Sequence, residues 1–168
     1  YNETSDLVFR DVKAGLVFGG PDTQGQAENE VLRCHFIRCD TGVQTVNWNS
    51  MDIWVWYCRF EDCGRGVHNV MGNWHVWQSL FFRSKLADLS SINLMAFSAV
   101  NNTSIGSKRF FDFSTGHTWG SPVSLTGNKV LFPAGDWAII LDNAGPYLLV
   151  DNALRLTGTG SFHSSPKV

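Results

Sequence analysis

The stretch that decides the fold is VLRCHFIRCDTGVQTV at residues 31–46, which recurs in outline as VWYCRFEDCGRGVHNV at residues 55–70. Aligned without gaps, the two stretches carry the same residue type at several positions, all at one constant offset, and five of these pairs lie in the interior of the stretch. The pairs are Cys34 and Cys58, Phe36 and Phe60, Cys39 and Cys63, Gly42 and Gly66, and Val43 and Val67. Self-similarity at one fixed offset indicates a repeat architecture.

The repeat extends in both directions along the chain. Phe9 precedes Phe36 at a slightly longer interval, and Phe81 follows Phe60 at a slightly shorter one. The apolar residues expected to succeed Phe81 are Val100, Val130 and Leu154. The intervals between successive members of this series are therefore unequal. Stacked helix pairs of fixed length would not tolerate that variation, whereas short strands joined by turns of different lengths would.

Within one repeat the apolar residues alternate with polar ones, as they do in a half-buried strand. Ile53 and Val55 show this period of two, the small Cys58 marks a bend, and glycines mark a turn further on. Each repeat therefore predicts three short strands. Such a unit cannot bury its own apolar face, so it must stack on copies of itself, with each coil pairing in parallel with the next.

The pattern of the repeat resembles the coil of right-handed parallel β-helix proteins of the pectate lyase-like superfamily, which includes polysaccharide lyases, glycoside hydrolases and phage tailspikes. The residues that carry the resemblance are Ile53, Val55, Cys58, Phe60 and the pair Gly66-Val67. It implies an all-β fold: a right-handed parallel β-helix solenoid of about seven coils with three short parallel sheets. Residues 1–168 would form this single domain.

Members of that superfamily often carry a ladder of stacked Asn side chains at one bend. The equivalent positions in this chain are expected at Cys34, Cys58, Ser79 and Ser98, so small side chains would replace the Asn ladder. The subgroup is therefore not identified. The four cysteines lack the spacing of a zinc site, and cysteines stacked side by side on parallel strands fit disulfide geometry badly. We predict reduced thiols in the core.

Composition and charge exclude several classes of function. The chain has 13 Lys and Arg against 15 Asp and Glu, with a net charge of −2, so it predicts neither a nucleic-acid partner nor an anionic membrane partner. It is 43% hydrophobic, yet no stretch is long enough to span a membrane. It begins without Met or a signal segment, and we interpret it as part of a longer extracellular protein.

Strand alternation also predicts which aromatic side chains face outward. With Ile53 and Val55 inward, Trp54 and Trp56 point outward, and His75 and Trp77 follow them in the next coil. Neighbouring strands about 4.8 Å apart would stack these rings into one patch. Such a patch is either a platform for pyranose rings or a surface covered by a loop, a second domain or another subunit.

A second outward column lies on the strand after the glycine turn, where Gln44 and His68 would be followed by Asp88 or Ser90. In the lyases that the chain resembles, the substrate groove runs along this sheet. The preceding turn contributes Lys13, Asp40, Arg65 and Lys85 in successive coils. Basic side chains there would bind the carboxylates of a uronic acid polymer.

These positions give the candidate sites. The predicted catalytic residues are His68, as the base that removes the C5 proton, with Arg65 and Lys85. The substrate-binding candidates are Gln44, Asp88, Trp54, Trp56, Trp77 and His75. A glycosidase is the weaker hypothesis because no pair of carboxylates lies on the groove strand. Oxygen ligands are too scattered for calcium, so no metal is predicted, and no cofactor is identified.

Two segments are predicted to leave the coils as inserted loops, residues 19–30 and residues 101–120, and residues 157–168 are predicted to be a frayed tail. The second loop carries Arg109, Asp112 and His117 and is the next place to expect a site. The sequence as a whole predicts an extracellular protein that binds a polysaccharide, with uronic acid elimination as the first guess at an activity. The alternative is a non-catalytic adhesin or tailspike-like solenoid, in which the Trp patch could make the chain a homo-oligomer.

Overall fold

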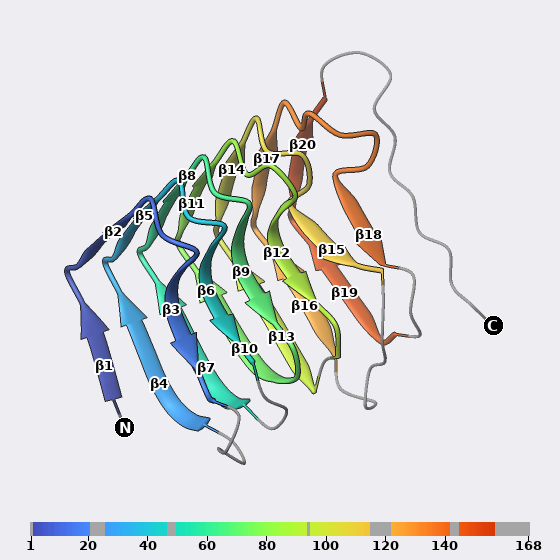
Figure 1. The fold of residues 1–168 in the computed structure, drawn as a ribbon. Coiled ribbons are helices and arrows are strands. Elements are labelled where there is room, and N and C mark those ends of the chain that lie inside the picture. Colours follow the sequence, from blue (N-terminus) through green and yellow to red (C-terminus); the bar gives the residue numbers. More distant parts are fainter. Residues whose placement is uncertain are drawn as a thin grey trace.

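Short alternating segments separated by tight corners form strands throughout the chain. The computed structural model describes residues 2–20, 26–46, 50–93, 95–114, 122–141 and 145–156. These residues contain strands and no helix, so none of them belongs to a helix that could cross a membrane. Successive strands wind into a parallel β-solenoid (Figure 1). In the described residues, each of the first six coils contributes one strand to each of three sheets, and the seventh contributes to the first two. The predicted all-β fold is confirmed.

Each sheet consists of strands that lie three apart in the chain and pair in parallel. The first sheet contains β1 (Asn2–Ser5), β4 (Gln26–Leu32), β7 (Ser50–Trp56), β10 (Gly72–Trp77), β13 (Ala96–Val100), β16 (Val123–Thr126) and β19 (Tyr147–Val150). The second contains β2 (Val8–Arg10), β5 (His35–Ile37), β8 (Arg59–Glu61), β11 (Leu80–Phe82), β14 (Thr103–Ile105), β17 (Lys129–Leu131) and β20 (Ala153–Arg155). The third contains β3 (Ala14–Phe18), β6 (Thr41–Thr45), β9 (Arg65–Asn69), β12 (Ala87–Ser91), β15 (Phe111–Phe113) and β18 (Ile139–Leu141).

A stack of phenylalanine rings runs through the first four coils. Phe9, Phe36, Phe60 and Phe81 are paired in register on the second sheet, with ring centroids 4.7–5.0 Å apart and nearly parallel planes. Each ring after the first lies against a glycine of the preceding coil: a β-carbon on Gly42 would lie 2.6 Å from the Phe60 ring. The stack confirms the predicted alignment as far as Phe81.

The prediction that Val100 succeeds Phe81 in the next coil is wrong. The structure pairs Phe81 with Ser104 rather than with Val100, and Ser104 in turn with Val130. Val100 instead pairs with Trp77 on the first sheet. Matching of apolar residues missed Ser104 because this serine takes the place of a phenylalanine.

Because the coils after Phe81 were misaligned, the sequence did not reveal the Asn ladder that the structure contains. The small side chains at the bend after the first sheet are Cys34, Cys58, Ser79, Asn102, Asn128 and Asn152, so Ser98 does not belong to them. The backbone N–H of Ser79 donates to the Asn102 Oδ1 at 2.9 Å, and that of Asn102 to the Asn128 Oδ1 at 3.0 Å. Each Asn amide also donates to a backbone carbonyl, which satisfies polar groups inside the coil.

Every described coil turns its corners through residues with a positive φ. The corner after the first sheet has this conformation at Asp6, Arg33, Tyr57, Gln78, Asn101, Gly127 and Asp151, and the corner after the second sheet at Asp11, Arg38, Asp62, Arg83, Gly106 and Phe132. Few of these are glycines, so the stacking of the coils imposes the strained conformation. Exposed arginine and aspartate side chains pair between successive corners, with Arg38 to Asp11 at 2.6 Å as one example.

Both predicted inserted loops contain regular strands. Residues 26–30 belong to β4, and residues 101–114 include β14 and β15, so the coils continue through the described residues of these segments. Asn101 and Gly106, which suggest turns, lie at corners and concealed the strands beside them. The predicted tail at 157–168 lies outside the described residues.

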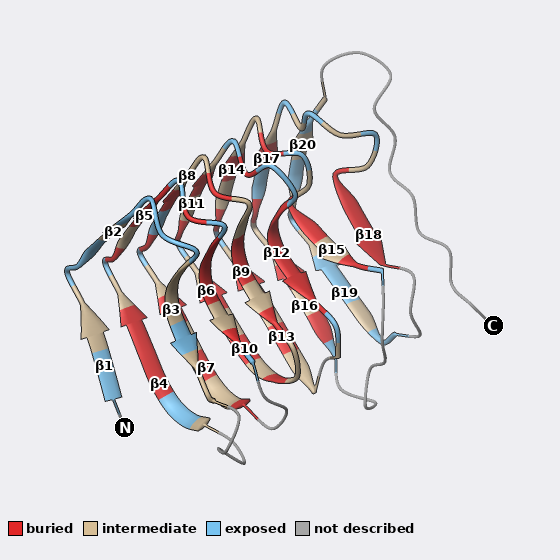
Figure 2. Ribbon diagram, in the orientation of Figure 1, coloured by how far each residue is buried: buried red, intermediate tan, exposed pale blue. Residues whose placement is uncertain are grey.

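The core is formed by buried residues of all three sheets. They are coloured red on the ribbon in Figure 2. The core includes all four cysteines, which are buried free thiols, as the stacking argument predicted. The strands of the first and last coils are only partly buried because each lacks a neighbour on one side. The middle coils therefore provide the most rigid support for a surface site.

Candidate functional site

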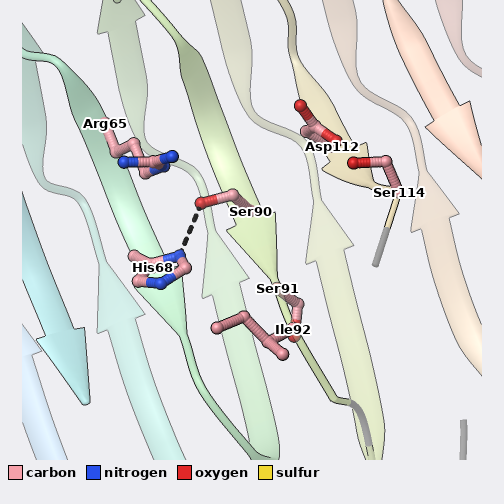
Figure 3. A pocket seen from close by; sticks show the side chains of 7 residues that line it. All are labelled: Arg65, His68, Ser90, Ser91, Ile92, Asp112 and Ser114. Atoms are coloured by element: carbon pink, nitrogen blue, oxygen red, sulfur yellow. Dashed lines mark hydrogen bonds between the residues drawn. The ribbon is translucent and has the colours of Figure 1, made fainter. Parts of the chain in front are cut away.

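A column of outward side chains crosses the third sheet and ends in a hollow. Gln44, His68, Ser90 and Asp112 are paired in register on β6, β9, β12 and β15. The last three line a hollow of about 290 Å³, shown in Figure 3. The full lining is Arg65, His68, Ser90, Ser91, Ile92, Asp112 and Ser114. The structure thus brings together two of the predicted catalytic residues, Arg65 and His68.

His68 is held by the neighbouring coil and is neutral at physiological pH. Its Nδ1 atom lies 2.9 Å from the Ser90 Oγ, the contact drawn in Figure 3. Burial lowers the pKa of His68 to about 4 because it disfavours the charged imidazolium, and the positive charge of Arg65 lowers it further. A neutral imidazole can accept a proton, although a group with this pKa is a weak base.

Arg65 carries an uncompensated positive charge in the hollow. Arg33, Arg38, Arg59, Arg83 and Arg109 each form an ion pair with a carboxylate. Arg65 has no such partner among the described residues. An unpaired guanidinium offers a planar set of N–H donors that matches a carboxylate, sulfate or phosphate.

Asp112 is the acidic member of the hollow, and Arg109 holds it in place. The Arg109 Nη1 lies 2.8 Å from the Asp112 Oδ2, whereas the buried Oδ1 has no hydrogen-bond partner. The pair leaves the charge of Asp112 largely neutralised. An anion approaching Arg65 therefore meets no unpaired carboxylate among the described residues of this wall.

Lys85 and Gln44 lie outside the hollow. Lys85 is exposed in the turn before β12, where its backbone N–H donates to the Cys63 carbonyl at 2.8 Å. Arg65 was expected in the same column of the turn, but it pairs with Thr41 and Ala87, further along the coil. Gln44 shares the outward column one coil before His68, so an elongated ligand that extends from the hollow could reach it.

Asp88 does not face the groove, and the prediction that it binds substrate there is wrong. It lies opposite Gly66, between the pairs that Ala87 and Leu89 make with β9, and its side chain is fully buried. All five residues of β12 are buried, so simple alternation of buried and exposed residues fails on this strand. Ser90 takes the outward position instead.

Sequence reasoning missed most of the far wall of the hollow. Asp112 had been placed in an inserted loop, and Ser91, Ile92 and Ser114 had not been singled out. A signal was present: Asp112 stands between Phe111 and Phe113, and both rings are fully buried. This apolar, polar, apolar order is typical of a strand with its polar side chain outward. His117 lies outside the described residues.

The four aromatic side chains predicted on the first sheet form a cluster. Trp54 stacks on His75 with centroids 4.0 Å apart, and Trp56 stacks on Trp77 at 5.5 Å. The two pairs meet edge to face, since the planes of Trp54 and Trp56 are inclined at 80°. One face of each ring is thus occupied by another ring of the cluster. Their role in binding a sugar stays a prediction.

Asp112 supplies the one carboxylate among the residues that line the hollow. No group of three His, Cys, Asp or Glu side chains among them lies close enough to hold a metal ion. Glu61 contacts His35 and Arg59 on the second sheet, away from Asp112 on the third. The hollow therefore presents a cation, a neutral imidazole and hydroxyls rather than a pair of carboxylates.

No family model, curated protein or solved structure matches the chain.

Proposed function

We propose that this β-solenoid belongs to the pectate lyase-like superfamily and binds an acidic polysaccharide outside the cell. The polymer lies along the third sheet, and one of its uronate residues occupies the hollow between β9 and β15. The observation that carries the proposal is the unpaired guanidinium of Arg65 in a hollow of about 290 Å³. A bidentate contact with the uronate carboxylate would compensate this charge.

The remaining lining fits a sugar ring. Ser90, Ser91 and Ser114 supply hydroxyls that can exchange hydrogen bonds with those of the sugar. Ile92, with 37% of its surface exposed, supplies an apolar contact for the C–H groups of the ring. A small number of polar groups beside apolar surface is typical of a ligand site.

The experiment that tests binding is a calorimetric titration with oligogalacturonate. We expect Arg65→Gln to weaken binding at least tenfold. Arg83→Gln is the matched control: it removes the same charge from an exposed corner, where Arg83 pairs with Asp62, and should bind as the wild type does. Equal affinity of the wild type and Arg65→Gln, or equal binding of a fully methyl-esterified oligomer, would contradict the proposal.

A second function, β-elimination, is favoured by His68. Its neutral imidazole lies in the same hollow as Arg65, which could hold the uronate carboxylate while the imidazole takes the C5 proton. The C4–C5 double bond would then form as the C4–O glycosidic bond breaks, and the leaving oxygen would take a proton from water. The negative charge of the bound uronate would raise the pKa of His68 and make it a stronger base. The test is ultraviolet absorbance of the unsaturated product: we expect the wild type to form it and His68→Ala to lose it. If the wild type binds the oligomer but forms no unsaturated product, the protein binds the polysaccharide without cleaving it.

A further inference from the structure

A cluster of polar side chains interrupts the interior of the solenoid at the point where the phenylalanine stack ends. In the first coils a ring packs against a glycine, as Phe81 does against Gly66. One coil further, Ser104 takes the place of Phe81 and Asp88 takes the place of Gly66. A ring and a glycine are thus replaced by a hydroxyl and a carboxyl.

The carboxyl of Asp88 is enclosed but has no hydrogen bond. Its side chain is fully buried, and neither Oδ1 nor Oδ2 has a hydrogen-bond partner. The hydroxyls of Ser84, Ser104 and Ser107 lie beside it and lower the pKa of its carboxyl, which opposes the increase caused by burial. The buried Ser84 Oγ also lacks a partner. The Ser107 Oγ accepts a hydrogen bond from the Ser84 backbone N–H at 3.0 Å, so the oxygens left without a partner are those of Asp88 and the Ser84 Oγ.

No cationic side chain of the described residues compensates Asp88. The side chains that influence its titration are the three serines. On the neighbouring strand β9, Arg65 lines the hollow on the outer surface. Arg109, which precedes β15, pairs with Asp112. A buried carboxylate is costly unless it is paired or coordinates an ion.

We propose that the interior of the solenoid holds a small monovalent cation, Na⁺ or K⁺, bound by the carboxylate of Asp88 and by the hydroxyls of Ser84, Ser104 and Ser107. Carboxylate and hydroxyl oxygens are hard ligands that suit alkali and alkaline-earth ions. The ligand set carries a single negative charge, which a monovalent ion neutralises and a divalent ion would overcompensate. Because the site is enclosed, the ion enters as the coils close during folding.

The test compares thermal unfolding of the full chain, refolded at pH 8 in chloride salts of sodium, potassium or choline at equal ionic strength. We expect a midpoint several degrees higher in sodium or potassium than in choline, rising with the logarithm of the cation concentration by mass action. Asp62→Asn, which alters an exposed carboxylate, should keep this difference, and Asp88→Asn should lose it.

If the wild type has the same unfolding midpoint in all three salts, the proposal is overturned. A proton, rather than a metal cation, would then neutralise Asp88. A salt difference that persists in Asp88→Asn would also overturn it, because the ion would then bind elsewhere. If Asp88→Asn fails to fold, Ser104→Ala replaces it as the variant. Loss of one hydroxyl ligand should reduce the difference between sodium and choline, and an unchanged difference would contradict the assignment.

Discussion

The imidazole of His68 and the hydroxyl of Ser90 are joined across two neighbouring coils, with 2.9 Å between Nδ1 and Oγ. Burial in this position lowers the pKa of His68 from 6.5 to about 4. Between these values the unfolded chain binds a proton that the folded chain does not bind. The free energy of unfolding should therefore fall as the pH is lowered from about 6.5 to about 4.

Two measurements check this prediction. In a nuclear magnetic resonance titration, the His68 ring should stay neutral down to below pH 5. In urea denaturation, His68→Gln should show a shallower loss of stability across the same range. An imidazole that titrates near its ordinary pKa would show that the ring is solvated and that the hollow is more open than described.

Because of Asp88, we expect the free energy of unfolding to change with pH in the direction opposite to the effect of His68. Burial raises the pKa of its carboxyl to about 7 from 3.8, so the folded chain binds the extra proton between these values. In choline buffer, where no small cation can compensate the charge, the free energy of unfolding should fall as the pH rises from about 4 through about 7. Denaturation of wild type and Asp88→Asn measures the effect. Parallel curves for the two proteins would contradict it.

The phenylalanine stack predicts a large cost for adding a single methyl group. A β-carbon on Gly42 would lie 2.6 Å from the Phe60 ring and 2.7 Å from the Gly66 carbonyl oxygen. Because that oxygen belongs to the paired backbone, it cannot move away, and Gly42→Ala should cost about 3 kcal/mol. Gly20→Ala, where a β-carbon meets nothing within 4 Å, is the control. Chemical denaturation that gives equal stability for both variants would disprove the packing.

The Asn ladder predicts a similar cost from the loss of hydrogen bonds. Asn102 is fully buried, accepts from the Ser79 N–H and donates to the Val76 carbonyl at 2.7 Å. Asn102→Ala would leave both backbone groups unsatisfied and should lower the free energy of unfolding by about 3 kcal/mol. Thr103→Ala, at the adjacent and only partly buried position, should have little effect. Comparable losses in the two variants would argue against the ladder.

The early coils could be predicted from the sequence because they repeat residue types as well as polarity. Cys58 and Phe60 follow Cys34 and Phe36 at one common offset, and this offset is the register that the structure shows. The alignment of Trp56 with Trp77 follows from the same frame and is also observed. Arg65 and His68 could be placed near one another for the same reason, since both belong to β9.

The later coils could not be aligned by polarity. Ser104 and Asp88 are polar residues at interior positions, so matching apolar residues selected Val100 and turned Asp88 outward. Such interior polar groups contact residues of neighbouring coils, which lie three strands away in the chain. No local sequence pattern reveals these contacts. Asp112 was missed because its strand is only three residues long.

The Asn ladder makes each of its coils depend on the next one along the chain. The Asn128 Oδ1 accepts from the backbone N–H and the side-chain amide of Asn102, and the Asn152 Oδ1 accepts in the same way from Asn128. Loss of the Asn152 side chain should therefore leave the backbone N–H of Asn128 without its acceptor. A defect in the last coil would in this way be passed back toward the middle of the solenoid.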